Sequence, residues 1–315
     1  MEPKNRLLII SRDAPRYARL IRKRHLPDLS LSAYEKDGVP GTDLETCTII
    51  LGEPDHIAPH LRGAKNLRWV QSAYAGVEVL LGPELRTDYL LTRVSGPFGP
   101  SMSEYVFAYI LALKRQVLES RENQLKRHWK ELPAGSLRGG YLGICGVGAI
   151  GGHIAKIGQS FGMTVWGIRR SGKAHPFVDR MFAPAQFDAF LSGPDYLVVT
   201  LPLTPETVHL FDTRAFEQMK PSSVLINVGR GAVVGEKALI DALKGKRIRG
   251  AVLDVFETEP LPKESPLWDM DNVLVTAHQS AHSFPEDVAD IFCENYGRFL
   301  AGEPLAHEVN FKRGY

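Results

Sequence analysis

The chain has 315 residues, of which 44% are hydrophobic and 23% are charged, and its formal net charge is +2. At about 100–200 residues per domain, this length predicts two domains and suffices to bury a sizeable core. The near-balanced charge gives no electrostatic basis for binding nucleic acid or a membrane surface. No apolar run reaches the roughly 18–20 residues of a membrane helix, and the run at 7–10 is too short for a signal peptide.

Three cysteines, Cys47, Cys145 and Cys293, stand at spacings that match no metal-binding motif. An odd and sparse set favours a reducing compartment over a disulfide framework. We therefore expect a cytoplasmic protein without a bound metal.

Short apolar runs alternate with turns and helical stretches in the first third of the chain. They predict parallel strands with helices between them, and hence a small α/β domain, at 7–11, 29–34, 48–51, 67–71 and 90–94. Apolar residues then recur at helical spacing over 101–115, which predicts a long, largely buried connecting helix. The following segment, 119–137, is polar and charged, with Trp129 as its one large anchor.

A second α/β series begins at 141. Its predicted strands lie at 141–145, 164–168, 196–200, 224–228, 251–255 and 273–276. Continuous apolar runs such as Tyr196-Leu197-Val198-Val199 are typical of strands that are covered on both faces. A last helix, at 285–301, is expected to return and pack on the first domain.

A GxGxxG motif directly follows the predicted strand 141–145; it reads Gly146-Val147-Gly148-Ala149-Ile150-Gly151. The first glycine permits a tight turn, the second lets the backbone approach a pyrophosphate, and the third lets the following helix pack close to the strand. The start of that helix presents free N–H groups to phosphate oxygens. In this strand–turn–helix context the motif predicts a dinucleotide site, with a ligand-free glycine-rich turn as the alternative.

The end of the next strand predicts which dinucleotide is bound. An NAD enzyme usually places Asp or Glu there for the ribose 2′-hydroxyl. This chain has Arg169-Arg170-Ser171 instead, and a guanidinium can bind a 2′-phosphate bidentately. The nearest acid downstream, Asp179, lies beyond Pro176 and is too far away to substitute. We expect NADP to be preferred and NAD to be used more weakly, unless the arginines are only a solvated strand end.

Reduction of a ketone by hydride transfer needs a cation that holds the substrate, a proton donor, and a group that keeps the donor charged and oriented. Candidates follow three successive predicted strands: Arg230, Glu259 and His278. Ligands of α/β proteins bind at the carboxyl ends of strands, so these side chains are expected to meet. His282 is a rival acid, but His278 stands directly at its strand end and is preferred.

With these residues the chain resembles the D-isomer-specific 2-hydroxyacid dehydrogenase family, and within it the glyoxylate/hydroxypyruvate reductase-like members. The match runs from the segment 69–78 to Val309-Asn310 and includes, in order and spacing, Leu201-Pro202-Leu203-Thr204-Pro205-Glu206-Thr207. The resemblance implies an α/β fold of two doubly wound parallel-sheet domains. A Rossmann-type dinucleotide-binding domain, 100–284, would be inserted into a flavodoxin-like substrate domain, 1–99 plus 285–315.

The resemblance also implies roles for the matched positions. His278 would be the general acid in ketone reduction and the base in the reverse reaction, and Glu259 would pair with it and favour the imidazolium. Arg230 would bind the carboxylate and keto oxygen of the substrate. The backbone N–H groups of Ala75, Gly76 and Val77 would bind the other side of that carboxylate. The Tyr74 side chain would add bulk around the substrate.

Further positions would contact the cofactor. Asp254 would bind the nicotinamide carboxamide and Val228 would lie behind the nicotinamide ring. The remaining contacts would come from Leu201, Pro202, Thr207, Gly229 and Ser280. The chain departs from the family pattern where Ala277 replaces a proline and Gln279-Ser280 replaces small apolar residues, which puts the local cofactor contacts in question.

The sequence therefore predicts an NADP-preferring oxidoreductase that interconverts glyoxylate, hydroxypyruvate or a similar 2-keto acid with its D-2-hydroxy acid. The resemblance implies a homodimer, formed through the second domain and the excursion 115–137. A phosphoglycerate dehydrogenase-like enzyme is an alternative, although such enzymes commonly carry a further regulatory domain, for which no room remains after 309. A dinucleotide-sensing corepressor is a second alternative, because such a protein could retain Arg230, Glu259 and His278.

Overall fold

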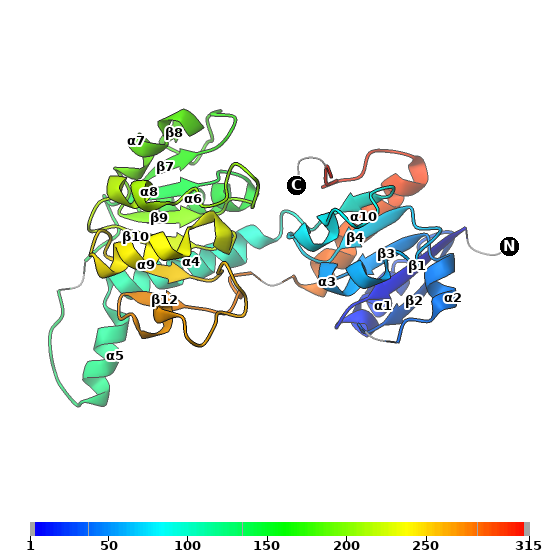
Figure 1. Ribbon diagram of the computed structural model, residues 1–315, viewed down its shortest axis with the longest axis horizontal. Coiled ribbons are helices and arrows are strands. Elements are labelled where there is room, and N and C mark those ends of the chain that lie inside the picture. The colour runs from blue at the N-terminus through cyan, green and yellow to red at the C-terminus, as the bar shows by residue number, and fades with distance from the viewer. Residues whose placement is uncertain (1–3, 37, 134, 282, 312–315) are drawn as a thin grey trace. The chain divides into compact units, whose positions relative to one another are not determined.

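The computed structural model describes residues 4–36, 38–133, 135–281 and 283–311. The chain divides into two compact units, Met1–Pro97 with Ser283–Tyr315 (unit 1) and Phe98–His282 (unit 2) (Figure 1). Each unit is built on one parallel sheet with helices packed against it. The alternation of apolar runs and helical stretches predicted α/β domains with parallel strands, and the family resemblance implied two doubly wound sheets; this fold class is confirmed.

The sheet of unit 1 has the strand order β2-β1-β3-β4-β5, and every neighbouring pair is parallel. This is the flavodoxin-like doubly wound order. Its strands are β1 (Asn5–Ile10), β2 (Leu29–Tyr34), β3 (Ile49–Gly52), β4 (Trp69–Ser72) and β5 (Leu90–Thr92). The inner strands β3 and β4 are buried at every position, as expected for strands covered on both faces.

The helices of unit 1 come from both ends of the chain. They are α1 (Ala14–Arg22), α2 (Gly41–Thr46), α3 (Pro54–Ile57) and α10 (Pro285–Ala301), with the 3-10 turns η1 (Ala58–His60) and η2 (Glu78–Leu81). The last helix, α10, packs against α1. Its Phe292 stacks on Trp69 with ring centroids 5.1 Å apart, and the Tyr296 hydroxyl donates to the Pro27 carbonyl over 2.8 Å. The predicted return of the last helix to the first domain is therefore confirmed.

The sheet of unit 2 has the order β12-β11-β10-β9-β6-β7-β8 and is also parallel throughout. Its strands are β6 (Tyr141–Cys145), β7 (Thr164–Ile168), β8 (Arg180–Phe182), β9 (Tyr196–Val199), β10 (Val224–Asn227), β11 (Gly250–Leu253) and β12 (Val273–Val275). Counted from β6, this is the Rossmann order 3-2-1-4-5-6 with one further strand. The strand order reverses between β6 and β9, where such sheets bind their ligands.

Helices cover the second sheet, and α4 packs along α6. They are α4 (Phe98–Lys114), α5 (Val117–Leu125), α6 (Ala149–Ser160), α7 (Phe187–Leu191), α8 (Thr213–Gln218) and α9 (Glu236–Lys244), with the 3-10 turns η3 (Pro184–Gln186), η4 (Gly231–Val233) and η5 (Pro266–Asp269). The Ser103 hydroxyl of α4 lies 2.8 Å from Nδ1 of His153 on α6. Among the described residues, no helix is both long and apolar enough to cross a membrane.

Three differences from the sequence-based predictions concern α4, β8 and Trp129. Helix α4 begins at Phe98 rather than at 101, because Pro100 falls in the first turn, where no backbone N–H is needed. Strand β8 was not predicted, since it has only three residues and begins with an exposed Arg180. The interpretation of Trp129 as an anchor was wrong: its side chain is 101% exposed, and α5 projects from unit 2 just before it (Figure 1).

Candidate active site

The glycine-rich loop joins β6 to α6 at the point where the strand order reverses. Gly146 has φ +111°, which only glycine adopts readily, and its N–H and that of Val147 both donate to the Ile168 carbonyl. Helix α6 starts at Ala149 with no acidic residue in its first turn. The loop therefore holds a positive helix terminus open toward the carboxyl edge of the sheet.

The other two glycines serve different purposes. A Cβ atom on Gly148 would meet nothing within 4 Å, whereas one on Gly151 would lie 2.4 Å from the Gly146 carbonyl oxygen. Gly151 is thus required for the packing of the helix on the strand. Gly148 leaves open space beside the first N–H groups of the helix, including those of Ala149 and Ile150. This arrangement fits a pyrophosphate.

The two arginines after β7 are used differently. Arg169 donates from Nε to the Lys173 carbonyl (2.8 Å) and from Nη2 to the Ala174 carbonyl (2.7 Å), so it stabilises its own turn. Arg170 and Ser171 are exposed. Hydrogen bonds from the backbone and from Thr204, and to a smaller extent the positive charge of Arg170, hold the pKa of Glu206 below its usual range.

Asp179 lies at the other end of β7. Its carboxylate accepts the N–H of Val165 over 2.7 Å and the side-chain amide of Gln159 over 3.3 Å. Val165 is the second residue of β7, whereas Arg169 follows the last one. Asp179 is therefore too far from the carboxyl end of β7 to bind a ribose there, as the sequence led us to expect. That strand end has Arg169, Arg170 and Ser171 instead.

The loop after β9 is closed by a threonine hydroxyl. Thr207 donates from its hydroxyl to the Pro202 carbonyl and accepts the Thr204 N–H, each over 2.7 Å. Leu201 is half-buried and packs against the core of unit 2, while Pro202 is exposed. The hydroxyl of Thr200 donates to the Gly146 carbonyl over 2.7 Å, so this loop is tied to the glycine-rich loop.

Arg230 stands in a tight turn after β10. The buried Asn227 side chain holds this turn, because its amide donates to the Arg230 carbonyl and its oxygen accepts the Gly229 N–H, each over 3.1 Å. Gly231 is required here, since a Cβ atom would lie 1.9 Å from the Phe256 backbone. Val228 is buried beneath the turn, and the half-buried Arg230 donates to the Gly229 carbonyl over 2.8 Å.

His278 and Glu259 form a direct pair. Nδ1 of His278 lies 2.7 Å from Oε2 of Glu259, and Oε1 of Glu259 accepts the Phe256 N–H over 3.0 Å. Because an ionised carboxylate only accepts, Nδ1–H is the donor and Nε2 is left for another partner. The side chains are 53% and 35% exposed, so the pair is accessible to a ligand.

The pair shifts the protonation of both groups. The hydrogen bond that His278 donates to Glu259 is the largest effect on His278 and raises its pKa, whereas burial and the nearby positive charge of Arg230 oppose the rise. Burial raises the pKa of Glu259, but hydrogen bonds from His278 and Phe256 outweigh this and leave the pKa below its usual range. The structure thus brings His278, Glu259 and Arg230 together, with a charged imidazole favoured.

The segment that carries His278 is held by Asp254. Asp254 is completely buried, and its carboxylate accepts the Thr276 hydroxyl (2.6 Å) and the N–H groups of Gln279 and Ser280 (each 2.8 Å). The Asp254 carbonyl accepts the His278 N–H, also over 2.8 Å. These bonds fix the path of the backbone around His278. That Asp254 and Ser280 also contact the cofactor stays a prediction.

In unit 1 the loop after β4 presents unused donors. The Ser72 hydroxyl bonds the backbone of Tyr74 on both sides, donating to its carbonyl over 2.9 Å and accepting its N–H over 3.0 Å. No hydrogen bond within the described part of the chain uses the N–H groups of Ala75, Gly76 or Val77. Such consecutive free donors suit an anion, and the Tyr74 side chain beside them is 40% exposed.

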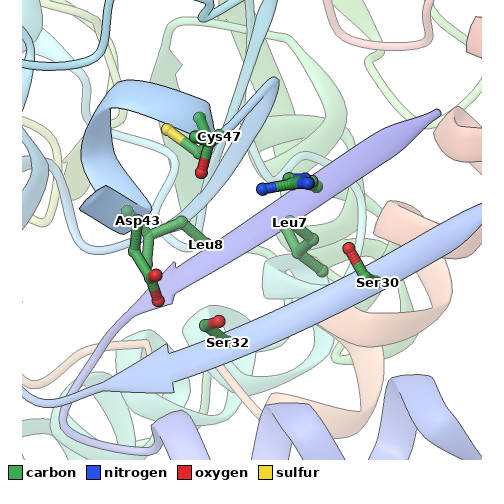
Figure 2. A pocket seen from close by; sticks show the side chains of 8 residues that line it. Leu7, Leu8, Ser30, Ser32, Asp43 and Cys47 are labelled. Carbon is green, nitrogen blue, oxygen red and sulfur yellow. The ribbon is translucent and has the colours of Figure 1, made fainter. Parts of the chain in front are cut away.

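Unit 1 also has a pocket of about 260 Å³ that lies elsewhere on its sheet (Figure 2). It is lined by Arg6, Leu7, Leu8, Ser30, Ser32, Asp43, Thr46 and Cys47. These residues belong to β1, to β2 and to α2 with Cys47 directly after it, whereas the 73–77 loop follows the carboxyl end of β4. Burial raises the pKa of Cys47 to about 11, so its thiol stays protonated and is no nucleophile.

The rival acid His282 lies outside the described residues. No group of three or more His, Cys, Asp or Glu side chains within the described ranges could hold a metal ion.

Sequence reasoning missed Asn227, Thr276 and Tyr105. The Tyr105 hydroxyl lies 2.6 Å from that of Thr276. The strand-end position of Asn227 and Thr276 was an available signal, but for Tyr105 there was none.

The comparison with protein families identifies this architecture. Residues 107–280 match the family model described as D-isomer specific 2-hydroxyacid dehydrogenase, NAD binding domain. A D-isomer specific 2-hydroxyacid dehydrogenase family protein from Aeromonas salmonicida is 44% identical, with a TM-score of 0.92; the alignment covers 98% of this chain and 99% of that one.

Two further solved structures are similar over whole chains. The Xanthobacter autotrophicus D-isomer specific 2-hydroxyacid dehydrogenase, in complex with NADPH and MES, is 33% identical with a TM-score of 0.88 and 99% coverage of both chains. The NADPH-dependent glyoxylate/hydroxypyruvate reductase of Sinorhizobium meliloti, in complex with NADP and sulfate, is 29% identical with a TM-score of 0.86, covering 99% of this chain and 100% of that one. The chain therefore belongs to the D-isomer specific 2-hydroxyacid dehydrogenase family and is an NAD(P)-dependent 2-hydroxyacid dehydrogenase.

Proposed function

We propose that this enzyme is an NADP-preferring reductase of short 2-keto acids such as glyoxylate or hydroxypyruvate, forming the D-2-hydroxy acid. The observation that carries the proposal is the His278–Glu259 pair, in which Nδ1 is bonded over 2.7 Å and the pKa of the imidazole is raised. A protonated donor beside the cation Arg230 is what reduction of a keto acid needs.

The proton step follows from the geometry of the pair. When bound, NADPH supplies the hydride that adds to the keto carbon of the substrate. Nε2–H of His278 donates a proton to the keto oxygen, which becomes the hydroxyl, and Glu259 stabilises the imidazolium until that transfer. Arg230 binds the substrate carboxylate and polarises the keto oxygen. In the reverse direction neutral His278 accepts the hydroxyl proton.

Substrate and cofactor binding are assigned to different domains. We propose 1–99 with 285–315 as the substrate domain, where the free N–H groups of Ala75, Gly76 and Val77 bind the substrate carboxylate. We propose 100–284 as the dinucleotide-binding domain, with the pyrophosphate on the N-terminus of α6. Around it we assign cofactor contacts to the residues predicted from the sequence, from the glycine-rich loop to Leu201, Pro202, Thr207, Val228, Gly229, Asp254 and Ser280.

NADP preference rests on the carboxyl end of β7. Two similar proteins are in complex with NADP or NADPH, and here that strand end has Arg169, Arg170 and Ser171 rather than a carboxylate. Because Arg169 is engaged with its own turn, Arg170 is the residue we assign to direct contact with the 2′-phosphate. NAD, which has a 2′-hydroxyl there, would bind more weakly.

Arg170→Ala should therefore raise the KM for NADPH by about 10–100-fold, the value of one or two charge-assisted hydrogen bonds, and leave the KM for NADH nearly unchanged. Steady-state kinetics with both cofactors measures this. Arg214→Ala is the control, because Arg214 is also exposed but pairs with Asp188 elsewhere in unit 2. An equal rise in the KM for NADH would contradict the assignment of Arg170 to the 2′-phosphate.

The proposed substrate class is tested by a steady-state panel. NADPH and NADH are each combined with glyoxylate, hydroxypyruvate, pyruvate, 2-ketobutyrate and a bulky aryl keto acid. We expect the short acids with NADPH to give the highest kcat/KM. Equal efficiency with NADH would contradict the NADP preference. Dinucleotide binding without turnover of any keto acid would instead favour a dinucleotide-sensing corepressor.

We also propose that the enzyme is a homodimer, on the evidence of one exposed apolar surface. The excursion after α4 carries Val117, Leu118, Leu125 and Trp129, whose side chains are 51%, 48%, 67% and 101% exposed. Four large apolar side chains on an arm that projects from unit 2 (Figure 1) are typical of a surface that another chain covers. We propose a second copy of this chain as the partner.

Leu125→Asp should shift the protein from dimer to monomer, because a carboxylate would be buried in the interface. Sedimentation equilibrium measures the change. Val208→Asp is the control, since Val208 is 48% exposed in unit 2 but lies off the arm. A wild-type protein that is monomeric at micromolar concentration would refute the dimer.

A further inference from the structure

We infer that Tyr105 on α4 is a positioning residue for His278, and that it acts through Thr276 and Asp254. The inference rests on the proposed role of His278 as the proton donor. Tyr105 is 171 residues away from Thr276 in sequence, yet their hydroxyl oxygens lie 2.6 Å apart. The sequence pattern had placed Tyr105 only among the apolar positions of a helix.

The direction of each hydrogen bond follows from what the groups can donate. The Asp254 carboxylate only accepts, so the Thr276 hydroxyl must give its single proton to Oδ1, over 2.6 Å. The Thr276 oxygen is then an acceptor toward α4, and the Tyr105 hydroxyl must be the donor. A directed chain therefore runs from Tyr105 through Thr276 to Asp254.

The Tyr105 hydroxyl remains a donor across the working pH range. Burial, the largest effect, raises the pKa of Tyr105 above its usual range, and Asp254 at the other end of the hydrogen-bond chain has no exposed surface. The phenol therefore stays protonated and remains a donor. A buried carboxylate needs such partners, because each bond it accepts replaces water that it has lost.

Asp254 in turn fixes the backbone that carries the acid. Its carboxylate accepts the N–H groups of Gln279 and Ser280, and its carbonyl accepts that of His278. His278 itself has φ +49°, a left-handed conformation that non-glycine residues adopt only when their surroundings enforce it. The Asp254 bonds enforce it here.

The position of the imidazole then has two supports. Glu259 holds the imidazole ring at Nδ1. The backbone segment that Asp254 fixes sets the position of the His278 Cα atom, from which the side chain extends. A small shift of that segment would lengthen the Nδ1–Glu259 contact and displace Nε2 from the keto oxygen. Since proton transfer requires hydrogen-bond distance, loss of the Tyr105 hydroxyl should slow the chemical step, while Tyr105 itself is assigned no contact with the dinucleotide.

The test compares two tyrosines on one helix. Tyr105→Phe removes the hydroxyl that bonds Thr276. Tyr109→Phe is the matched control, because the two rings pack together with centroids 4.7 Å apart, while the Tyr109 hydroxyl has no hydrogen bond among the described residues. We expect Tyr105→Phe to lower kcat for keto acid reduction about fivefold or more, with the KM for NADPH within about twofold, and Tyr109→Phe to match the wild type.

A double-mutant cycle tests whether Tyr105 acts through Thr276. Thr276→Val breaks both hydrogen bonds and should lower kcat further than Tyr105→Phe, whereas Thr276→Ser keeps the hydroxyl and should retain activity. In the Thr276→Val background, adding Tyr105→Phe should change nothing more. Fully additive losses would contradict the proposed route. The Thr276→Ser result separates loss of the hydroxyl from a failure to fold.

An NMR titration of His278 gives a readout that needs no turnover. The wild-type resonance, assigned by its absence in His278→Ala, should titrate above the usual range, and Tyr105→Phe should move its pKa back toward that range because the Glu259 contact loosens. An unchanged kcat and an unchanged His278 pKa in Tyr105→Phe would overturn the inference. If the pKa moves but the wild type reduces no keto acid, the positioning role stands and the proposed function fails.

Discussion

Replacing His278 by alanine is expected to lower kcat for 2-keto acid reduction by about 10²–10⁴-fold, the usual contribution of a general acid. Binding of NADPH should survive, because the glycine-rich loop and the β7 end do not depend on the imidazole. The kcat is measured from NADPH oxidation and the affinity from a fluorescence titration. These results would identify His278 as the side chain that donates the proton to the keto oxygen.

His209→Ala is an unusually close control. His209 is also 53% exposed, also has φ +49°, and also pairs with a carboxylate, with Nε2 3.1 Å from Oε1 of Glu257. It stands in the segment before α8 and bears no assigned role. Equal losses in both variants would contradict the assignment of His278, as would loss of NADPH binding in a folded His278→Ala protein.

Glu259→Gln should move the pH dependence of reduction to lower pH. Reduction needs protonated His278, so kcat/KM is constant below the pKa of His278 and falls as pH rises through it. Because the hydrogen bond that His278 donates to the Glu259 carboxylate is the main cause of the raised pKa, the neutral amide should lower that pKa. Activity at pH 8 should then fall by about 10–100-fold, more than at pH 6, since each unit of pKa is a factor of ten.

The reverse reaction supplies the sign test. Oxidation of the hydroxy acid needs neutral His278, so its rate should rise with pH, and Glu259→Gln should move that rise to lower pH as well. Glu257→Gln is the matched control, because Glu257 bears the same relation to His209. A pH profile that Glu259→Gln leaves in place would mean that another group, and not His278, gives the proton.

Much of the fold could be predicted because its signals are local. The apolar runs that became β2, β6 and β7, and the helix α10, have the bounds that periodicity indicated. Strand β8 could not be predicted, since three residues with an exposed arginine have no period to recognise. Trp129 was misread because a large apolar side chain in a polar segment was expected to be buried in its own unit, whereas this side chain is 101% exposed.

The site was predictable as far as topology determines it. Parallel strands end at one edge, so residues after β10, β11 and β12 had to gather, and His278 does meet Glu259. The individual roles of the side chains at the site could not be predicted. Whether Arg169 faces a ligand or its own turn depends on loop geometry, and the bond from Tyr105 depends on a helix 171 residues away along the chain. Neither leaves a mark in local sequence.

We propose that this chain reduces short 2-keto acids with NADPH to D-2-hydroxy acids. The most direct measurement incubates the wild-type enzyme with NADPH and hydroxypyruvate, follows NADPH consumption, and resolves the product by chiral chromatography. We expect one D-glycerate to form per NADPH oxidised, with glyoxylate also accepted. Formation of the L enantiomer, or no NADPH oxidation by any short 2-keto acid in a folded protein that binds the dinucleotide, would contradict it.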